Sequence, residues 1–135
     1  PRFFGSAGYM PRTVTSDQSV TEEILGTTDG GATWSVVAQR SGPRGVAAAA
    51  LIDAQHIVVF IGQTRYSSGD SGRTWSTSPA QGYHSIAKPE FASATIGWGV
   101  ESYGSCSGFK VNCSYSSHLL QTTDGGASWS VLFPS

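Results

Sequence analysis

The fold of this chain is decided by the stretch Thr27-Thr28-Asp29-Gly30-Gly31-Ala32-Thr33-Trp34, because its pattern occurs three times. The pattern is Ser/Thr-x-Asp-x-Gly-x-Ser/Thr-Trp. The two further copies are Ser68-Gly69-Asp70-Ser71-Gly72-Arg73-Thr74-Trp75 and Thr122-Thr123-Asp124-Gly125-Gly126-Ala127-Ser128-Trp129. We call each copy a box.

The chemistry of a box predicts a self-contained turn. Its Asp accepts hydrogen bonds from N–H groups of the turn, and the Gly two residues later permits a positive φ. The second Ser or Thr closes the turn, and the Trp is expected to bury its ring between sheets. We therefore assign a structural role to four positions of each box, which are Asp29, Gly31, Thr33 and Trp34; Asp70, Gly72, Thr74 and Trp75; and Asp124, Gly126, Ser128 and Trp129.

The boxes recur at the spacing of a four-stranded sheet. Short apolar runs flank them, such as Ile24-Leu25 before the first box and Val36-Val37 after it. Apolar runs bounded by Gly and Asp are typical of hairpins. The box tryptophans recur every ~40–55 residues, which matches the repeat length of a propeller blade. The sequence therefore predicts an all-β fold, with about three β-propeller blades of four antiparallel strands in an incomplete ring.

We expect one partial propeller over residues 1–135, with blades at about 1–40, 44–79 and 84–135. Strands are predicted at 45–52, 56–61, 63–68 and 74–78 in the second blade, and at 85–91, 96–100, 117–121 and 128–132 in the third, with 101–116 as an inserted loop. An ungapped alignment of Asp29 with Asp124 places Phe3 on Trp98, in a second strand. We therefore expect the first blade to lack its innermost strand. Closed propellers have about four to eight blades, so a longer chain or further copies are expected to complete the ring.

Charge and cysteine usage limit the classes of partner. The net charge is −1 and the eight Lys and Arg residues are scattered, which argues against nucleic acid as a partner. No apolar run approaches the ~20 residues of a membrane-spanning helix. Cys106 and Cys113 lie in a Gly/Ser-rich segment that can bring them together, so we expect a disulfide and an exported protein, extracellular or periplasmic. Two free thiols in a cytosolic loop are the alternative.

The sequence predicts no metal and no cofactor. Two cysteines cannot make a tetrahedral zinc site by themselves. The Asp-x-Gly spacing of the boxes lacks the further acidic or amide ligands of an EF-hand.

In its boxes, and in Gly97-Trp98-Gly99-Val100 before the third box, the chain resembles the BNR/Asp-box repeat superfamily. This superfamily includes bacterial sialidases, family 74 xyloglucanases, sortilin-type receptors and photosystem II assembly factors, and the form of the boxes is most similar to the last three. The resemblance covers nearly the whole chain and implies the propeller fold. It implies little about function, because in the superfamily the box lies on the rim, away from the central binding face.

Residues that look catalytic have a simpler structural interpretation. Gly69-Asp70-Ser71-Gly72 is similar to the segment around a chymotrypsin-type nucleophile, with His56 and Asp53 to complete a triad, but Asp70 and Gly72 already belong to a box. Pro11-Arg12-Thr13 does not match the Arg-Ile/Leu-Pro of sialidases. We predict no catalytic residue, because nothing around the acids outside the boxes distinguishes them from solvated residues; these acids are Asp17, Glu22, Glu23, Asp53, Glu90 and Glu101.

We therefore interpret the chain as a non-catalytic binding or assembly module that presents loops to a protein or glycan partner. Tyr103, Phe109 and Tyr115 lie in the predicted 101–116 insertion, where exposed rings favour a contact; packing beneath the loop is the alternative. Two alternative functions stay open. In the first, the chain is part of a xyloglucanase- or sialidase-like glycoside hydrolase. In the second, it is a structural part of a larger extracellular assembly.

Overall fold

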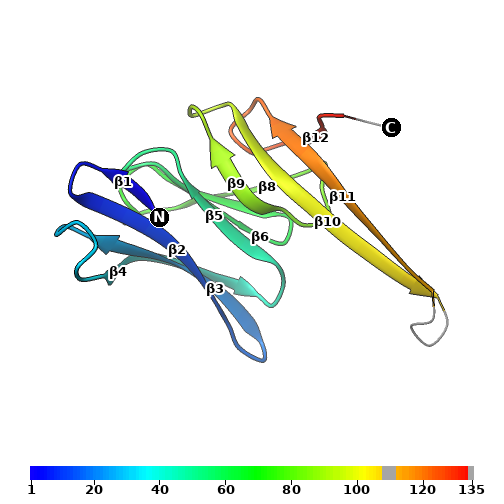
Figure 1. The fold of residues 1–135 in the computed structure, drawn as a ribbon, viewed down its shortest axis with the longest axis horizontal. Helices are drawn as coiled ribbons and strands as arrows, with labels where there is room; N and C mark the ends of the chain where they lie inside the picture. The colour runs from blue at the N-terminus through cyan, green and yellow to red at the C-terminus, as the bar shows by residue number, and fades with distance from the viewer. Residues whose placement is uncertain (108–111, 134–135) are drawn as a thin grey trace.

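Three four-stranded antiparallel sheets make up the structure, a computed structural model that describes residues 1–107 and 112–133 (Figure 1). Sheet 1 contains β1 (Arg2–Phe4), β2 (Ala7–Thr15), β3 (Ser19–Thr27) and β4 (Ser35–Pro43). Sheet 2 contains β5 (Ala47–Leu51), β6 (Ile57–Ile61), β7 (Thr64–Ser68) and β8 (Ser76–Pro79). Sheet 3 contains β9 (Ala87–Phe91), β10 (Gly97–Ser107), β11 (Asn112–Thr122) and β12 (Ser130–Val131). The strands of each sheet follow chain order, which confirms the predicted all-β fold of propeller-like blades in an incomplete ring.

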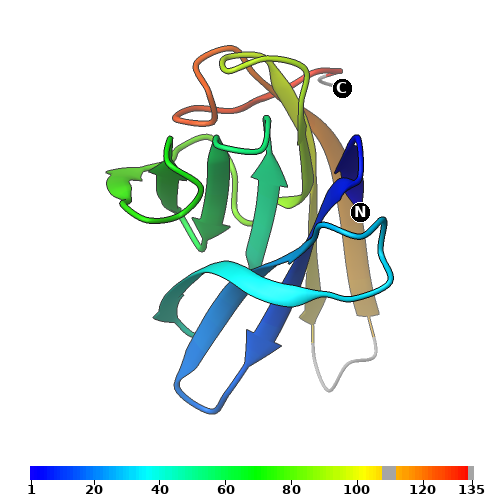
Figure 2. The same ribbon diagram turned by 90° about the vertical axis from the view of Figure 1, so that its left-hand side faces the viewer.

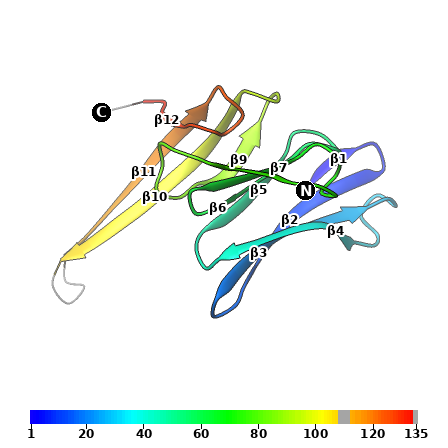
Figure 3. The ribbon, with the colours of Figure 1, turned by 180° about the vertical axis from the view of Figure 1, so that it is seen from behind.

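Sheet 2 lies between the other two sheets, and both of its faces are covered (Figures 1 and 3). Its strand β6 is buried along its whole length. Successive side chains of a strand point to opposite faces. Ile57, Val59 and Ile61 therefore pack against sheet 1, while Val58 and Phe60 pack against sheet 3. Burial on both faces explains why this strand is a continuous apolar run.

The first strands of the three sheets converge at one edge of the arrangement. β5 contacts β9, and the guanidinium of Arg2 in β1 donates to the backbone carbonyl of Leu51 in β5. The run Ala47–Ala50 suits this inner position, because small side chains let packed sheets approach closely. Figure 2 views the molecule from the side of sheet 1, with sheet 3 behind it.

The first sheet has the same four strands as the others, which corrects the expectation that the first blade lacks its innermost strand. β1 holds the first position, because it pairs with β2 through Phe3↔Gly8 just as β9 pairs with β10 through Phe91↔Gly97. The ungapped alignment of Phe3 with Trp98 fails mainly because the hairpin from Gly97 to Thr122 is longer than the equivalent hairpin from Gly8 to Thr27. β1 has only three residues, too few for a recognisable strand pattern.

Each box forms the same hydrogen-bonded turn between the third and fourth strands of its sheet. In the second box, one carboxylate oxygen of Asp70 accepts from the Ser68 hydroxyl at 2.8 Å and from the Thr74 N–H at 2.9 Å. The other oxygen accepts from the Thr74 hydroxyl at 2.6 Å, and the Gly72 N–H donates to the Ser68 hydroxyl at 2.8 Å. The first and third boxes make the same bonds. The first Ser or Thr of each box is thus a further member of the turn, which the sequence reasoning missed.

A second recurring bond ties each box to the turn between the first two strands of its sheet. In all three sheets the residue after the Asp donates its N–H to a carbonyl of that turn. The bonds run from Gly30 to Ser6 (3.1 Å), from Ser71 to Gln55 (3.0 Å) and from Gly125 to Thr95 (2.9 Å). The donor has a φ of 63–74° in each case, a left-handed conformation that favours glycine, and Ser71 adopts it as well. The two turns therefore lie together at the same end of every sheet.

The box tryptophans are not equally buried. Trp129 is 5% exposed and packs edge-on against three rings, those of Phe60, Tyr83 and Phe91. Trp75 is half-buried beside the core between sheets 1 and 2. Trp34 is also half-buried, and its ring packs against Phe3 at a centroid distance of 6.2 Å. Trp129 is enclosed between sheets 2 and 3, whereas no described sheet covers the outer face of sheet 1.

Replacement of Asp70 by Asn is expected to lower stability at neutral pH and to flatten its pH dependence in acid. Hydrogen bonds from Thr74 and Ser68 lower the pKa of Asp70 to about 2, below the ~3.9 of an unfolded chain. The stabilisation by the carboxylate is therefore complete above about pH 4 and is lost as the pH falls toward about 2. Thermal unfolding from pH 7 to pH 2 measures the effect, with Asp17→Asn in the β2–β3 turn as the control. An Asp70→Asn protein whose melting temperature falls as steeply in acid as that of the wild type contradicts the assignment.

Trp129→Ala is expected to reduce the free energy of unfolding by about 3–5 kcal/mol, because it empties a site enclosed by two sheets. Trp34→Ala, at the equivalent but half-open site, is expected to cost clearly less. Denaturant unfolding of the two variants gives the comparison directly. Equal losses would show that packing between sheets is not what stabilises the box tryptophan.

Candidate functional site

Residues 101–107 and 112–116, expected from the sequence to belong to an inserted loop, instead form the distal strands of a long hairpin. β10 and β11 pair antiparallel without a break from Gly97↔Thr122 to Ser107↔Asn112. The base of this hairpin belongs to sheet 3, and its distal part extends past sheet 2 in the same direction as the β2–β3 hairpin (Figures 1 and 3). Pairing continues outward because each added pair extends a register already fixed in sheet 3. The Gly and Ser content, which is typical of loops, concealed these strands.

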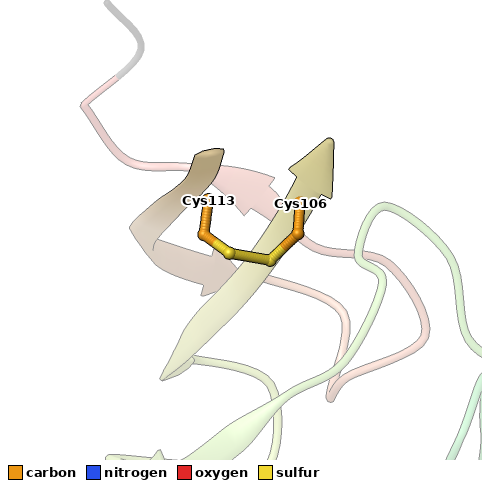
Figure 4. The surroundings of a disulfide bond; sticks show 2 residues. All are labelled: Cys106 and Cys113. Atoms are coloured by element: carbon orange, nitrogen blue, oxygen red, sulfur yellow. A yellow bond between two sulfur atoms is a disulfide. The ribbon is translucent and has the colours of Figure 1, made fainter. Parts of the chain in front are cut away.

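A disulfide joins Cys106 to Cys113 in the distal part of the hairpin (Figure 4). The two cysteines face each other directly in the strand register, and their Cα atoms are 4.0 Å apart. So close an approach is typical of a non-hydrogen-bonded pair in antiparallel strands. The predicted disulfide is confirmed, and it fixes the register of the hairpin. A disulfide is also typical of proteins from oxidising compartments.

One face of the hairpin continues from the disulfide as a row of cross-strand pairs. Tyr115 lies opposite Gly104 and covers it, since a Cβ added at Gly104 would lie 2.4 Å from the Tyr115 ring. In the next pair, the hydroxyl groups of Ser102 and Ser117 are 3.0 Å apart. The Tyr115 side chain is nevertheless 79% exposed. The hairpin therefore presents an aromatic ring on a ribbon of fixed register.

Among the three aromatic residues expected to contact a partner, the structure places Tyr115 as an exposed ring. Tyr103 belongs to β10, but its side chain lies outside the described structure, and Phe109 lies outside the described residues. Tyr83, another aromatic residue outside the boxes, is buried and donates its hydroxyl to the carbonyl of Gly62 at 2.9 Å. Burial raises the pKa of Tyr83 to about 12, so its role is in the core.

Glu101, at the base of the hairpin, is 4% exposed and lies between two histidines. One of its carboxylate oxygens accepts from the backbone N–H of His84 and lies 2.9 Å from the Nδ1 atom of that residue. The other oxygen lies 3.6 Å from Nδ1 of His118, on β11. Burial disfavours the ionised form of Glu101, but the hydrogen bonds and charge of His84, together with a hydrogen bond from His118, hold the pKa of the carboxyl below its ordinary value. Because His84 precedes β9, this carboxylate ties the hairpin to the connection between sheets 2 and 3.

Glu22 is a second carboxylate that the structure buries, although both were expected from the sequence to be solvated. Glu22 is 2% exposed and accepts from the Thr13 hydroxyl at 2.6 Å. It lies on the same face of β3 as Val20 and Ile24, the face that packs against sheet 2. Burial raises the pKa of Glu22, and the bond from Thr13 offsets part of this effect. The strand alternation that turns Glu22 and Glu101 inward is hidden in the sequence by polar neighbours.

A cleft of about 260 Å³ lies where the inner strands of the three sheets meet. Arg2, Tyr9, Lys88 and Glu90 line it with residues of β5. Lys88 has a φ of 49°, in a bulge where it and Pro89 together oppose one residue of β10. Bulges of this kind re-aim side chains. The cleft is a second candidate site, with cationic and anionic side chains from different sheets. No local sequence pattern indicates it, because these residues are far apart along the chain.

The triad considered from the sequence is not assembled. Nδ1 of His56 lies 2.8 Å from each carboxylate oxygen of Asp53. The Ser71 hydroxyl instead donates to the carbonyl of Ala54 at 3.1 Å, and its backbone is held in the box. These contacts thus stabilise two adjacent turns, the β5–β6 turn that contains Asp53, Ala54 and His56 and the box turn that contains Ser71.

No protein-family model matches this chain, and no curated protein matches it. Over residues 1–107 and 112–133, no three His, Cys, Asp or Glu side chains are grouped so as to hold a metal ion. In the same part of the chain, no helix is long and apolar enough to cross a membrane. Function is therefore inferred from the geometry of the hairpin and the cleft.

Replacing both Cys106 and Cys113 by Ser is expected to loosen the end of the hairpin while the three sheets stay folded. For so short a loop the chain-entropy model gives a stabilisation by the disulfide of about 2–3 kcal/mol. Its loss should destabilise the distal strands, which pair there with each other and with no third strand among the described residues. Amide hydrogen exchange should accelerate at Ser114 and Ser116, whose N–H groups face β10, whereas the amides of β6 should stay protected. Unchanged exchange at Ser114 and Ser116 would mean that the disulfide does not hold the hairpin together.

Proposed function

We propose that this chain is part of a BNR/Asp-box β-propeller and acts as a non-catalytic binding module that presents the β10–β11 hairpin to a protein or glycan partner. The observation that carries the proposal is the Tyr115 ring, 79% exposed on a disulfide-closed hairpin. An aromatic ring with few rotatable bonds loses little conformational freedom when it binds, so it is favoured as an anchor. The disulfide lowers the cost further, because the strand that carries the ring is already ordered.

The superfamily assignment is supported by the boxes. Three segments that are far apart in the chain make the same set of hydrogen bonds around an Asp, and each joins the third strand of a sheet to the fourth. Repetition of one turn in successive four-stranded sheets is typical of propeller blades. Export to an extracellular or periplasmic location is part of the proposal, and the disulfide supports it.

Further blades, from this chain or from other copies, are proposed to cover the two outer faces. Val36, 45% exposed, lies opposite the buried Leu25 on the face of sheet 1 that points away from sheet 2. Leu119, 40% exposed, lies on the outer face of sheet 3, since its neighbour Leu120 packs inward. Apolar side chains on both outer faces favour the stacking of sheets of the same kind.

Tyr115 is expected to be a point of contact with the partner. With a photo-crosslinking benzoylphenylalanine in place of Tyr115, irradiation in the secreted fraction of the source cells should give a specific protein adduct. The same amino acid in place of Val14, 44% exposed on the β2–β3 hairpin, is the matched control. A glycan array with wild type and Tyr115→Ala tests the other partner class.

The partner identified in this way should bind Tyr115→Ala at least about tenfold more weakly than wild type. The proposal fails if both crosslinking positions capture the same proteins and no glycan distinguishes wild type from Tyr115→Ala.

A further inference from the structure

The outer edge of β11 is open along the distal hairpin. β12 pairs with β11 at Leu120 and Gln121, next to the base. Within residues 1–107 and 112–133, no strand pairs with Ser114–Ser117 on the side away from β10. Unpaired main-chain groups on such an edge are a template for another strand.

The direction of the main-chain groups along this edge follows from two independent observations. The Leu132 N–H donates to the carbonyl of Leu119 at 2.8 Å, so the main-chain groups of Leu119 point away from β10. Since this direction alternates along a strand, those of Tyr115 and Ser117 point the same way. The short Cα separation of the cysteine pair, 4.0 Å, places Cys113 in the same non-hydrogen-bonded set. Tyr115 and Ser117 therefore direct both N–H and C=O groups into solvent.

In the other long hairpin the corresponding edge is occupied, because β4 pairs with β3 from Ser19↔Pro43 to Gly26↔Ser35. The outer edge of β2 carries Pro11 and Arg12, which are residue types that discourage strand addition. The residues Asn112–Ser117 of β11 include neither a proline nor a charged side chain. The third strand of sheet 1 is therefore covered where its counterpart in sheet 3, β11, is open.

We propose that the edge of β11 at Tyr115–Ser117 binds an extended, uncharged segment of a partner protein, which adds to sheet 3 as a further strand. The inference rests on the proposed binding function and specifies the partner as a polypeptide. The added strand continues the line of β12, which already occupies this edge at Leu120–Gln121. The N–H and C=O groups of Tyr115 and Ser117 supply the hydrogen-bond ladder, and the disulfide keeps their spacing fixed. An uncharged segment fits because Ser114–Ser117 offer no ionised side chain as a counter-charge.

The test uses a displayed library of random twelve-residue peptides, selected on the full, oxidised chain. Ser117→Pro removes one outward N–H without removing a bond between β10 and β11, so selected peptides should bind it at least about tenfold more weakly. Ser117→Ala keeps that N–H and loses only the hydroxyl, so it should bind them like wild type. Thermal unfolding and disulfide content of Ser117→Pro establish that the protein remains folded. Hydrogen exchange on the wild type adds a second readout, since a bound peptide should protect the amides of Tyr115 and Ser117.

Peptides that bind Ser117→Pro as tightly as wild type, or that leave both amides unprotected, overturn the proposal. So does a library from which no peptide is enriched. A crosslink or glycan contact at Tyr115 would then still support the binding module, with a contact made by side chains alone. A concentration-dependent dimer of the chain that Ser117→Pro dissolves would assign the edge to a second copy and overturn the choice of partner.

Discussion

The carboxylate at the centre of each box is the constraint on which the rest of the structure depends. It gathers two hydroxyl groups and a backbone N–H around one side chain, and so fixes the reversal between the third and fourth strands. The next residue ties that reversal to the turn between the first two strands. Because the same network occurs in all three sheets, their strands end at matching positions. Equivalent faces can then stack, as they do on both sides of sheet 2.

Stacking in turn explains which side chains are enclosed. Phe60 on sheet 2 meets Trp129 on sheet 3, whereas Trp34, at the equivalent place on sheet 1, is only half-buried. The same alternation carries Glu22 and Glu101 inward, where each carboxylate has hydrogen-bond partners. Buried carboxylates need such partners, because ionisation away from water is otherwise costly. The repeat thus positions polar groups as well as apolar ones.

The β10–β11 hairpin departs from the repeat, and the candidate functions gather around it. Its base pairs with β9 and so has the geometry of a blade. Its distal part has no third strand beside it among the described residues, and a disulfide joins its two strands. The covalent bond supplies the order that a neighbouring strand gives elsewhere in the fold. What remains is a ribbon with a fixed register, an exposed ring at Tyr115 and an open edge beside it. Those three properties are what a recognition element requires.

The sequence alone determined the three boxes, the all-β class and the order of the blades, and it predicted the disulfide with two free thiols as the alternative. These features depend on contacts within a few residues of each other, or on a period that one chain displays. Only the tertiary structure decided the rest. β1 is too short to show a pattern, and the strands of the distal hairpin are rich in Gly and Ser, so pairing with neighbours defines both. The inward direction of Glu22 and Glu101, and the meeting of Arg2 with Lys88 at one cleft, depend on which sheet faces which. Such relations join residues far apart in the chain, and no local pattern of side chains encodes them.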